Sequence, residues 1–184
     1  MPFENLGYAT IDHHRAIRVG MPEVIFGKGK TAEQVCGIAS KLLEQASNVL
    51  ATRTTPEAYE LLRAKFPDAE YFPRSGALRV WRERTIHGKG KLVIISAGTT
   101  DQPVAEEAVV TAEILGNEVD QIHDVGVAGI HRLFGNFERI KAARVIVVCA
   151  GMEGALPSAV GGLVRCPVIA VPTSVGYGAS FLGL

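Results

Sequence analysis

Groups that can bind phosphate or move a proton gather at turns in the second half of the chain. The first turn, residues 96–101, reads Ser-Ala-Gly-Thr-Thr-Asp. Gly98 lets the backbone approach a ligand closely, while Asp101 can accept a proton or cap the following helix. The hydroxyls of this turn belong to Ser96, Thr99 and Thr100. Ligand binding and simple helix capping fit this motif equally well, and it is not a P-loop because no Gly-Lys-Ser/Thr follows.

A second turn, residues 123–132, places two imidazoles, a carboxylate and a guanidinium around two glycines. Asp124 can orient a substrate hydroxyl or a water, Gly126 permits close approach, and Arg132 can hold a phosphate. The structural alternative is a polar turn in which Asp124 caps the next helix. For His131, a packing or surface role is the alternative to binding.

Two further turns and one arginine complete the set. Residues 151–158 include Gly151, Met152, Glu153 and Pro157. Glu153 lies beside a predicted helix start, which favours its ionised form; it can serve as a general base or only interact with the helix dipole. Residues 172–178 are long enough to fold over a ligand or to form a plain loop. Arg53, between a predicted strand and a helix, can reach a phosphate or stay solvated.

The elements that must position these turns alternate between strands and helices. Apolar strands are predicted at 91–97, 118–122, 144–149 and 167–171, and helices at 103–115, 130–142 and 153–163, with a further helical start at 176–184. Apolar strands that alternate with helices predict a parallel sheet covered on both faces. Ligands bind such sheets beyond the carboxyl ends of the strands, where the strand order reverses.

The first half predicts a smaller α/β domain. Strands are expected at 23–26, 48–51, 69–72 and 77–81, and helices at 32–45 and 55–66. Thr31 is a predicted N-cap, and Pro56 suits the first position of the second helix. The Gly-Lys-Gly-Lys-Thr sequence at 27–31 is interpreted as a turn and cap. We expect a boundary after residue 88, giving domains 1–88 and 89–184.

Composition limits the partners. The chain has 184 residues, 19 Lys+Arg against 19 Asp+Glu, and 47% hydrophobic residues. Without a basic excess, nucleic acid is not expected as a main partner, and no apolar run approaches the roughly 20 residues of a membrane span. The three cysteines suggest neither a disulfide framework nor a zinc site, so a reducing cytoplasm is expected. His13 and His14 are a weak metal signal.

These strand ends resemble one family. In order, residues 96–101, 150–157 and 167–172 resemble the PurE enzymes, N5-carboxyaminoimidazole ribonucleotide mutase and aminoimidazole ribonucleotide carboxylase. The whole chain, including 22–27 and 51–53, is more similar to their relative LarB, the pyridinium-3,5-biscarboxylic acid mononucleotide synthase. The resemblance implies a small N-terminal α/β unit followed by a flavodoxin-like three-layer α/β/α parallel-sheet domain of the PurE type.

Two departures separate the chain from the purine enzymes. They carry Ser-Ala-His-Arg where residues 123–126 read His-Asp-Val-Gly, and a histidine where this chain has Ala155. Both differences argue against carboxylation of aminoimidazole ribonucleotide, which remains the alternative enzyme activity.

The LarB resemblance implies a specific reaction. The substrate would be nicotinic acid adenine dinucleotide, carboxylated on its pyridine ring with carbon dioxide and hydrolysed to release AMP, as the first step of nickel-pincer cofactor synthesis. The glycine loops and Arg53 or Arg132 would hold phosphates. Asp101, Glu153 and Asp124 would transfer protons or position a water or Mg²⁺. The resemblance also implies a homo-oligomer, an octamer, with no organic prosthetic group.

In this family a cysteine adds to the pyridinium ring. Its position lies beyond residue 184, and none of Cys36, Cys149 and Cys166 matches it. The apolar end at 180–184 looks cut within a helix, so we expect a truncated record of an active family in which the last helices are missing. The alternative is a non-catalytic remnant that binds a nucleotide.

Overall fold

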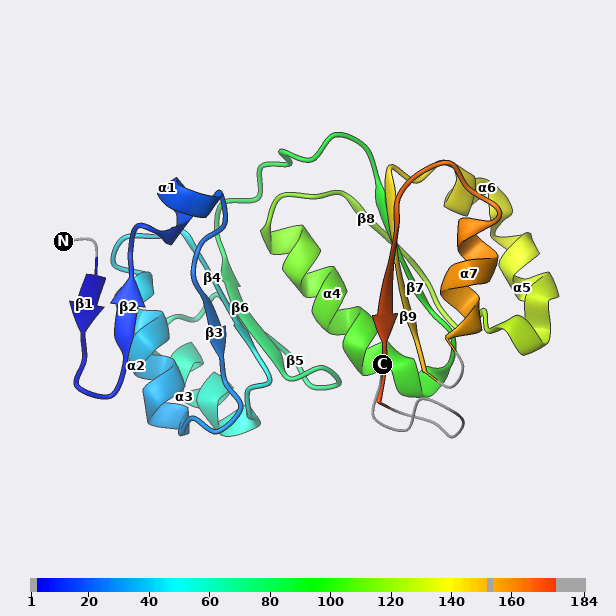
Figure 1. The fold of residues 1–184 in the computed structure, drawn as a ribbon. Helices are drawn as coiled ribbons and strands as arrows, with labels where there is room; N and C mark the ends of the chain where they lie inside the picture. The colour runs from blue at the N-terminus through cyan, green and yellow to red at the C-terminus, as the bar shows by residue number, and fades with distance from the viewer. Residues whose placement is uncertain (1–2, 152–153, 175–184) are drawn as a thin grey trace. The chain divides into compact units, whose positions relative to one another are not determined.

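The computed structural model describes residues 3–151 and 154–174. Contacts divide the chain into two compact units, Met1–Thr85 and Ile86–Leu184. The predicted domain boundary after residue 88 stays a prediction. Each unit has a hydrophobic core of its own, and Figure 1 shows the helices and strands of both.

The N-terminal unit is built on a four-stranded sheet in the order β3-β4-β6-β5. Its strands are β3 (Val24–Phe26), β4 (Asn48–Thr52), β5 (Ala69–Phe72) and β6 (Ala77–Trp81). Strand β3 is parallel to β4, whereas β6 is antiparallel to both β4 and β5. The apolar sides of α2 (Ala32–Leu42) and α3 (Pro56–Lys65) join side chains of the sheet in one core.

Local capping explains where these helices begin. The Thr31 hydroxyl accepts a hydrogen bond from the Gln34 N–H, and the Gln34 side chain accepts one from the Thr31 N–H, which together form a capping box. At the start of α3 the Thr55 hydroxyl accepts a hydrogen bond from the Ala58 N–H, and Pro56 occupies the first turn, where a missing N–H costs nothing.

Three elements at the N-terminus were not predicted: β1 (Phe3–Asn5), β2 (Thr10–Asp12) and α1 (Arg15–Val19). Strands β1 and β2 form a separate antiparallel pair. Strands of three residues are too short to show alternation of apolar and polar side chains. No residue of α1 is buried, so this helix has no apolar face that its sequence could reveal.

The C-terminal unit is built on a parallel four-stranded sheet in the order β10-β9-β7-β8. Its strands are β7 (Leu92–Ser96), β8 (Val119–Ile122), β9 (Val145–Ala150) and β10 (Val168–Pro172). As Figure 1 shows, α4 (Gln102–Ile114) covers one face. The other face carries α5 (Ile130–Gly135), α6 (Phe137–Lys141) and α7 (Ala155–Gly161). The expected flavodoxin-like α/β/α class with a parallel sheet is therefore confirmed.

Successive side chains of this sheet point to opposite faces and pack against the helices on either side. Val93 and Ile146 belong to the core that contains α5, α6 and α7. Ile94 and Cys149 belong to the smaller core beneath α4. Strands buried on both faces produce the continuous apolar runs seen in the sequence.

Two helix predictions were wrong in extent. The predicted helix 130–142 is two helices, because the chain leaves helical geometry at Asn136, whose amide donates to the Arg132 carbonyl at 3.0 Å. The helix predicted at 153–163 is limited to α7, because Gly154 before it is left-handed (φ 65°). The helical start predicted at 176–184 lies outside the described residues.

Candidate functional site

The strand order reverses at β7, because the connections from β7 onwards run first to one side of this strand and then to the other. Strand β8 follows β7 and lies on one side of it, and β9 lies on the other side. Because all four strands are parallel, the turns that follow them leave the same edge of the sheet. In open α/β sheets this edge, next to the reversal, is where ligands bind.

Backbone hydrogen bonds join these turns to one another. The Ala97 N–H donates to the Cys149 carbonyl, and the Gly126 N–H donates to the Ala97 carbonyl, both at 3.0 Å. The Thr173 N–H donates to the Ala150 carbonyl, also at 3.0 Å. Residues 96–101, 123–126, 149–151 and 173 are therefore joined in one connected group of turns, which we call the strand-end rim. Gly98, Gly126 and Gly151 all belong to it.

Gly126 is a point of close approach in the strand-end rim. A Cβ atom at this position would stand 3.3 Å from the Ala97 carbonyl oxygen. Gly98 is different, since a Cβ there would meet its nearest neighbour, an Asp101 oxygen, at an ordinary 3.7 Å. A side chain at Gly126 would therefore be a tight fit against the turn that follows β7, whereas a side chain at Gly98 would make only ordinary contacts.

Asp101 is nearly buried, with 5% of its surface exposed. One carboxylate oxygen accepts the Gly98 N–H at 2.9 Å, and the other accepts the Thr173 hydroxyl at 2.5 Å. The carboxylate therefore ties the turn after β7 to the residue after β10. Thr173 was not among the predicted site residues; its place directly after the last strand was the available signal.

Ser96 and His123 form a second polar pair. Ser96 is fully buried, and its hydroxyl lies 3.0 Å from His123 Nδ1. His123 Nε2 lies 3.3 Å from the Gln121 side-chain oxygen. The imidazole is exposed but held at two points. An oriented imidazole is suited to proton transfer, a role for which the sequence analysis did not single out His123.

Asp124 and Arg132 neutralise each other. The Arg132 guanidinium donates to the Asp124 carboxylate at 2.7 Å, and both side chains are largely exposed. Asp124 adopts a left-handed backbone conformation (φ 58°). Arg132 also lies against Gly129, where a Cβ would come within 2.6 Å of its Nε. A phosphate at Arg132 would have to compete with this carboxylate.

The hydroxyls of Thr99 and Thr100 are the exposed donors of the strand-end rim. Both residues are exposed on the short 3₁₀ turn η1 (Thr99–Asp101). Within the described residues neither hydroxyl has a hydrogen-bond partner. They are therefore available to a ligand without losing an existing bond.

The remaining predicted residues are placed less centrally. Gly151 accepts a hydrogen bond from the Gly154 N–H at 3.1 Å, and Pro157 lies within α7. Met152 and Glu153 lie outside the described residues. His131 is exposed on the first turn of α5. Arg53 belongs to the N-terminal unit, so its assignment to the same site as Arg132 stays a prediction.

None of the three cysteines offers a thiolate at the strand-end rim. Burial, with a further contribution from the charge of Asp101, raises the pKa of Cys149 to about 12, so its thiol is protonated at neutral pH. Cys36 lies in the core of the N-terminal unit. Cys166 precedes β10 and is therefore at the opposite edge of the sheet.

Residues 3–151 and 154–174 contain no group of three His, Cys, Asp or Glu that could hold a metal ion. The predicted Mg²⁺ stays a prediction. In the same part of the chain, no helix is both long and apolar enough to cross a membrane.

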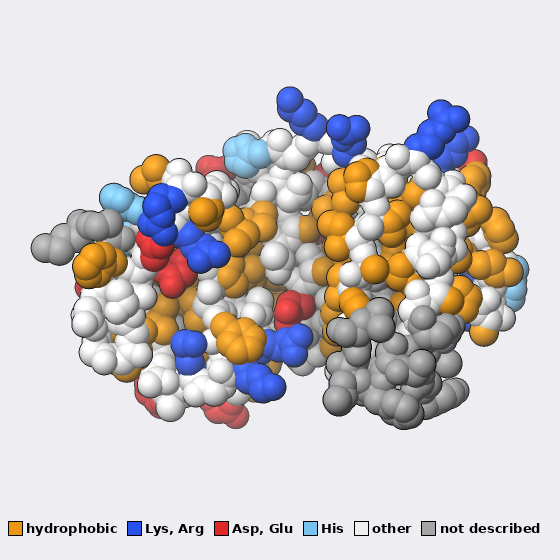
Figure 2. Space-filling model, in the orientation of Figure 1, with side chains coloured by type: hydrophobic (Ala, Val, Ile, Leu, Met, Phe, Trp, Pro, Cys, Tyr) orange, Lys and Arg blue, Asp and Glu red, His pale blue; other side chains and the backbone are white. Residues whose placement is uncertain are grey.

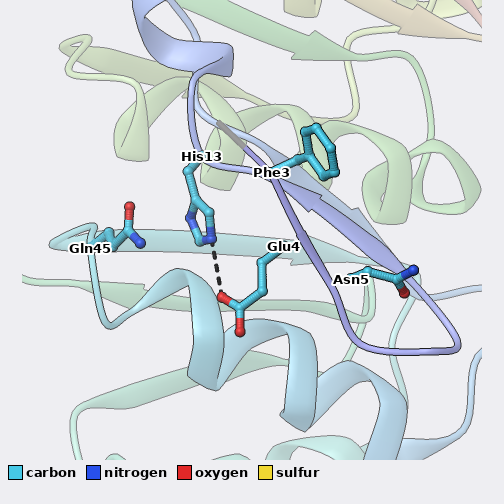
Figure 3. Close-up of a pocket in the computed structure, with 5 residues that line it drawn as sticks. All are labelled: Phe3, Glu4, Asn5, His13 and Gln45. Atoms are coloured by element: carbon cyan, nitrogen blue, oxygen red, sulfur yellow. Dashed lines mark hydrogen bonds and ion pairs between the residues drawn. The ribbon is translucent and has the colours of Figure 1, made fainter. Parts of the chain in front are cut away.

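A separate cavity of about 440 Å³ lies in the N-terminal unit (Figure 3). The figure shows His13 pointing towards Glu4, and the two side chains are 3.4 Å apart. Hydrogen bonding to Lys41, followed by hydrogen bonding to His13, lowers the pKa of Glu4. Because these groups satisfy one another, we do not place the candidate site here.

The chain is similar to one described family and to one curated protein. Residues 3–83 match the family described as the LarB/PurE-like N-terminal domain. Over 178 residues the chain is 42% identical to the uncharacterized protein MJ0165 of Methanocaldococcus jannaschii. That similarity covers 91% of this chain and 69% of the relative.

Proposed function

The chain belongs to the LarB/PurE-like family of carboxylase-type enzymes, and from this premise we propose that it acts on nicotinic acid adenine dinucleotide. The reaction would place a carboxylate on the pyridine ring and hydrolyse the phosphoanhydride. Its products would be pyridinium-3,5-biscarboxylic acid mononucleotide and AMP. The observation that supports this proposal is the strand-end rim, which joins glycines, free hydroxyls and an oriented imidazole at one edge of the sheet.

The strand-end rim has the groups that a diphosphate needs. Thr99 and Thr100 offer unengaged hydroxyls, and Gly98 leaves space beside them for a close approach to the backbone. Arg132 offers a guanidinium, which would exchange the Asp124 carboxylate for a phosphate oxygen. The phosphate contact predicted for Arg53, which belongs to the N-terminal unit, stays a prediction.

The carbon–carbon bond requires a temporary nucleophile on the ring. A thiolate adds to the pyridinium, the resulting neutral enamine attacks carbon dioxide, and loss of the ring proton and of the thiolate restores the pyridinium. Carbon dioxide replaces that proton, so the carboxylation involves no net redox change. We assign this thiolate to none of Cys36, Cys149 and Cys166, because Cys149 is protonated at neutral pH and the other two lie away from the strand-end rim. The resemblance to LarB implies a cysteine that follows residue 184, and the carboxylation is proposed for a chain that contains it.

Proton transfer in this scheme has several candidates. Glu153 and Asp124 stay proposed for this role, and His123 joins them because Ser96 and Gln121 orient its ring. Asp101 fits better as a positioning residue, since each of its oxygens already accepts a hydrogen bond.

The second candidate is a protein that binds the dinucleotide without carboxylating it. The absence of a reactive cysteine in the described part of the strand-end rim favours this alternative. Both candidates require binding of the dinucleotide, and only the first forms a new carbon–carbon bond.

Incubation with labelled bicarbonate separates the candidate functions. We expect label in the pyridine mononucleotide, with one AMP released for each label incorporated. Label in an imidazole ribonucleotide, when aminoimidazole ribonucleotide is offered, would instead support the purine activity. Binding of the dinucleotide without any incorporated label would support the binding-only alternative and contradict the proposed carboxylation.

A further inference from the structure

Ser96 and His123 lie side by side because of the pairing of β7 with β8. Within these parallel strands Ile95 is paired with Ile122. Each is followed directly by one member of the polar pair, since Ser96 ends β7 and His123 is the first residue after β8. The Val125 N–H donates to the Ser96 carbonyl at 3.3 Å, which holds the turn after β8 against the end of β7. The contact between the Ser96 hydroxyl and the His123 ring is therefore a consequence of the strand register.

The buried hydroxyl of Ser96 decides which nitrogen of His123 carries the proton. Ser96 has no exposed surface, and a buried hydroxyl needs an acceptor for its hydrogen. Within residues 3–151 and 154–174, the acceptor that it reaches is His123 Nδ1, at 3.0 Å. Nδ1 can accept only when the proton of the neutral ring is on Nε2. The pair therefore fixes the Nε2–H tautomer of His123.

Gln121 supports the same tautomer from the other side of the ring. Its side-chain oxygen lies 3.3 Å from His123 Nε2, where it can accept the Nε2 proton. Both residues are exposed, and this distance is long for a hydrogen bond between nitrogen and oxygen. An oxygen of a ligand can therefore replace Gln121 as the acceptor.

The two acidic residues that flank His123 in the sequence are engaged with arginines. Asp120 accepts hydrogen bonds from Arg139, and Asp124 accepts one from Arg132. Among the described residues, no carboxylate lies within hydrogen-bond distance of the His123 ring. The Nε2–H is therefore not committed to a charged acceptor within the described part of the chain.

An anion at the strand-end rim depends on neutral hydrogen-bond donors. No residue of the strand-end rim is Lys or Arg, and Arg132 in α5 is bonded to Asp124. Most Lys and Arg side chains that Figure 2 shows on the C-terminal unit lie at its upper end, where the strands of the sheet begin. The neutral donors at the strand-end rim include the Nε2–H of His123 and the exposed hydroxyls of Thr99 and Thr100.

We propose that His123 acts at the strand-end rim as a neutral hydrogen-bond donor, through Nε2–H, to a negatively charged oxygen of the substrate. A neutral imidazole can stabilise an oxygen on which negative charge accumulates. The inference rests on the proposed function, in which one substrate carries both a carboxylate and a diphosphate. It also narrows the role of His123: with Nδ1 occupied and the proton on Nε2, the neutral ring has no free lone pair to remove a proton. That step stays with Glu153 or Asp124, and Ser96 and Gln121 are positioning residues.

Nitrogen-15 spectra of the imidazole rings test the tautomer in the full chain without ligand. Above pH 8, where imidazoles are neutral, protonated and unprotonated ring nitrogens have well-separated resonances. We expect His123 to show Nε2–H alone. His131 is exposed and has no hydrogen-bond partner among the described residues, so it should show the average of both tautomers. The variant His123→Gln identifies the resonances, and an Nδ1–H signal or an averaged pattern for His123 would overturn the proposal.

Ser96→Ala removes the hydroxyl that holds Nδ1, so the His123 ring should change to the averaged pattern expected of His131. Ser40→Ala is the matched control, because the Ser40 hydroxyl donates to the Cys36 carbonyl in α2 of the other unit. It should leave the His123 resonances unchanged. An unchanged tautomer in Ser96→Ala would contradict the positioning role of Ser96. The measurements on the parent chain decide the proposal even where Ser96→Ala does not fold.

The donor role is tested on the same resonances by titration with nicotinate, inorganic phosphate and the neutral nicotinamide. We expect at least one of the two anions to shift the His123 Nε2 resonance saturably, and nicotinamide to leave it unchanged. A shift with nicotinate identifies the pyridine carboxylate as the acceptor, and a shift with phosphate identifies the diphosphate. A shift with neither anion, or an equal shift with nicotinamide, would overturn the donor role.

These outcomes are distinct from those that test the proposed function. Absence of labelled product would overturn the carboxylation and leave the tautomer and the anion shifts of His123 in place. Labelled product from a protein whose His123 ring carries its proton on Nδ1 would overturn this inference alone.

Discussion

The carboxylate of Asp101 joins two segments that are 72 residues apart in the sequence. Thr173→Val keeps the side-chain volume but removes the hydroxyl, which leaves a buried carboxylate oxygen without its donor. We expect the free energy of unfolding in urea to fall by about 1–3 kcal/mol.

Thr111→Val is the matched control for this loss. The Thr111 hydroxyl donates to the Glu107 carbonyl within α4, so its removal leaves no buried charge unpaired. We expect a change within about 0.5 kcal/mol for this variant. Equal effects of Thr173→Val and Thr111→Val would contradict the positioning role of Asp101.

The three thiols should differ in reactivity. Because the pKa of Cys149 is raised to about 12, it has almost no thiolate at pH 8, whereas Cys166 is partly exposed. A reagent that modifies accessible thiols should therefore react quickly with Cys166, and with Cys36 and Cys149 only after unfolding. Cys166→Ser should abolish the fast phase, and Cys149→Ser should retain it. Loss of the fast phase in Cys149→Ser would refute the assigned burial.

At the scale of single residues, the sequence located the polar turns but not their pairings. Gly98, Thr99 and Asp101 could be identified because they follow a predicted strand. The Asp101–Thr173 and Ser96–His123 contacts depend on which strands are neighbours, and local sequence does not encode that order. The roles proposed for the site residues stay predictions.

At the scale of elements, Gly126 lies in tight contact with a neighbouring turn, whereas Gly98 has more space around it. Gly126→Ala places a methyl group 3.3 Å from the Ala97 carbonyl oxygen, whereas Gly98→Ala meets nothing closer than 3.7 Å. We expect Gly126→Ala to destabilise the C-terminal unit by about 1–3 kcal/mol and to weaken dinucleotide binding. Gly98→Ala should leave stability nearly unchanged in the same urea titration. Equal stability of the two variants would show that the turns are not in contact.

The Asp120–Arg139 pair connects β8 to α6. Hydrogen bonding to Arg139 is the main cause that lowers the pKa of Asp120 from its usual 3.8. A lowered pKa in the folded state stabilises the fold above about pH 4, and this contribution is lost as the pH falls through the folded value. Asp120→Asn should therefore be less stable than the parent at pH 7, with a difference that shrinks below pH 4. A difference that is independent of pH would contradict this linkage.

Strands were easier to predict than helix ends. The strands predicted at 69–72 and 77–81 match β5 and β6, because each is bounded by turn residues. The break between α5 and α6 was missed, since the apolar period continues across Asn136. The short elements before residue 20 have too few buried positions to show any period.

At the scale of the whole molecule, the alternation of apolar strands with helices was enough to predict the class of the fold. Strand order was not predicted from that pattern, although it decides which turns form the strand-end rim. The homo-oligomer, an octamer by resemblance, stays a prediction. Light scattering would test it, with eight chains per particle expected and a monomer contradicting it.

The most direct test of the strand-end rim is a titration with nicotinic acid adenine dinucleotide, followed through backbone amide resonances. We predict that Gly98, Thr99, Thr100, Gly126 and Gly151 shift together and yield one dissociation constant. Shifts that saturate at different concentrations, or that leave these residues unchanged, would contradict a single dinucleotide site at this edge of the sheet.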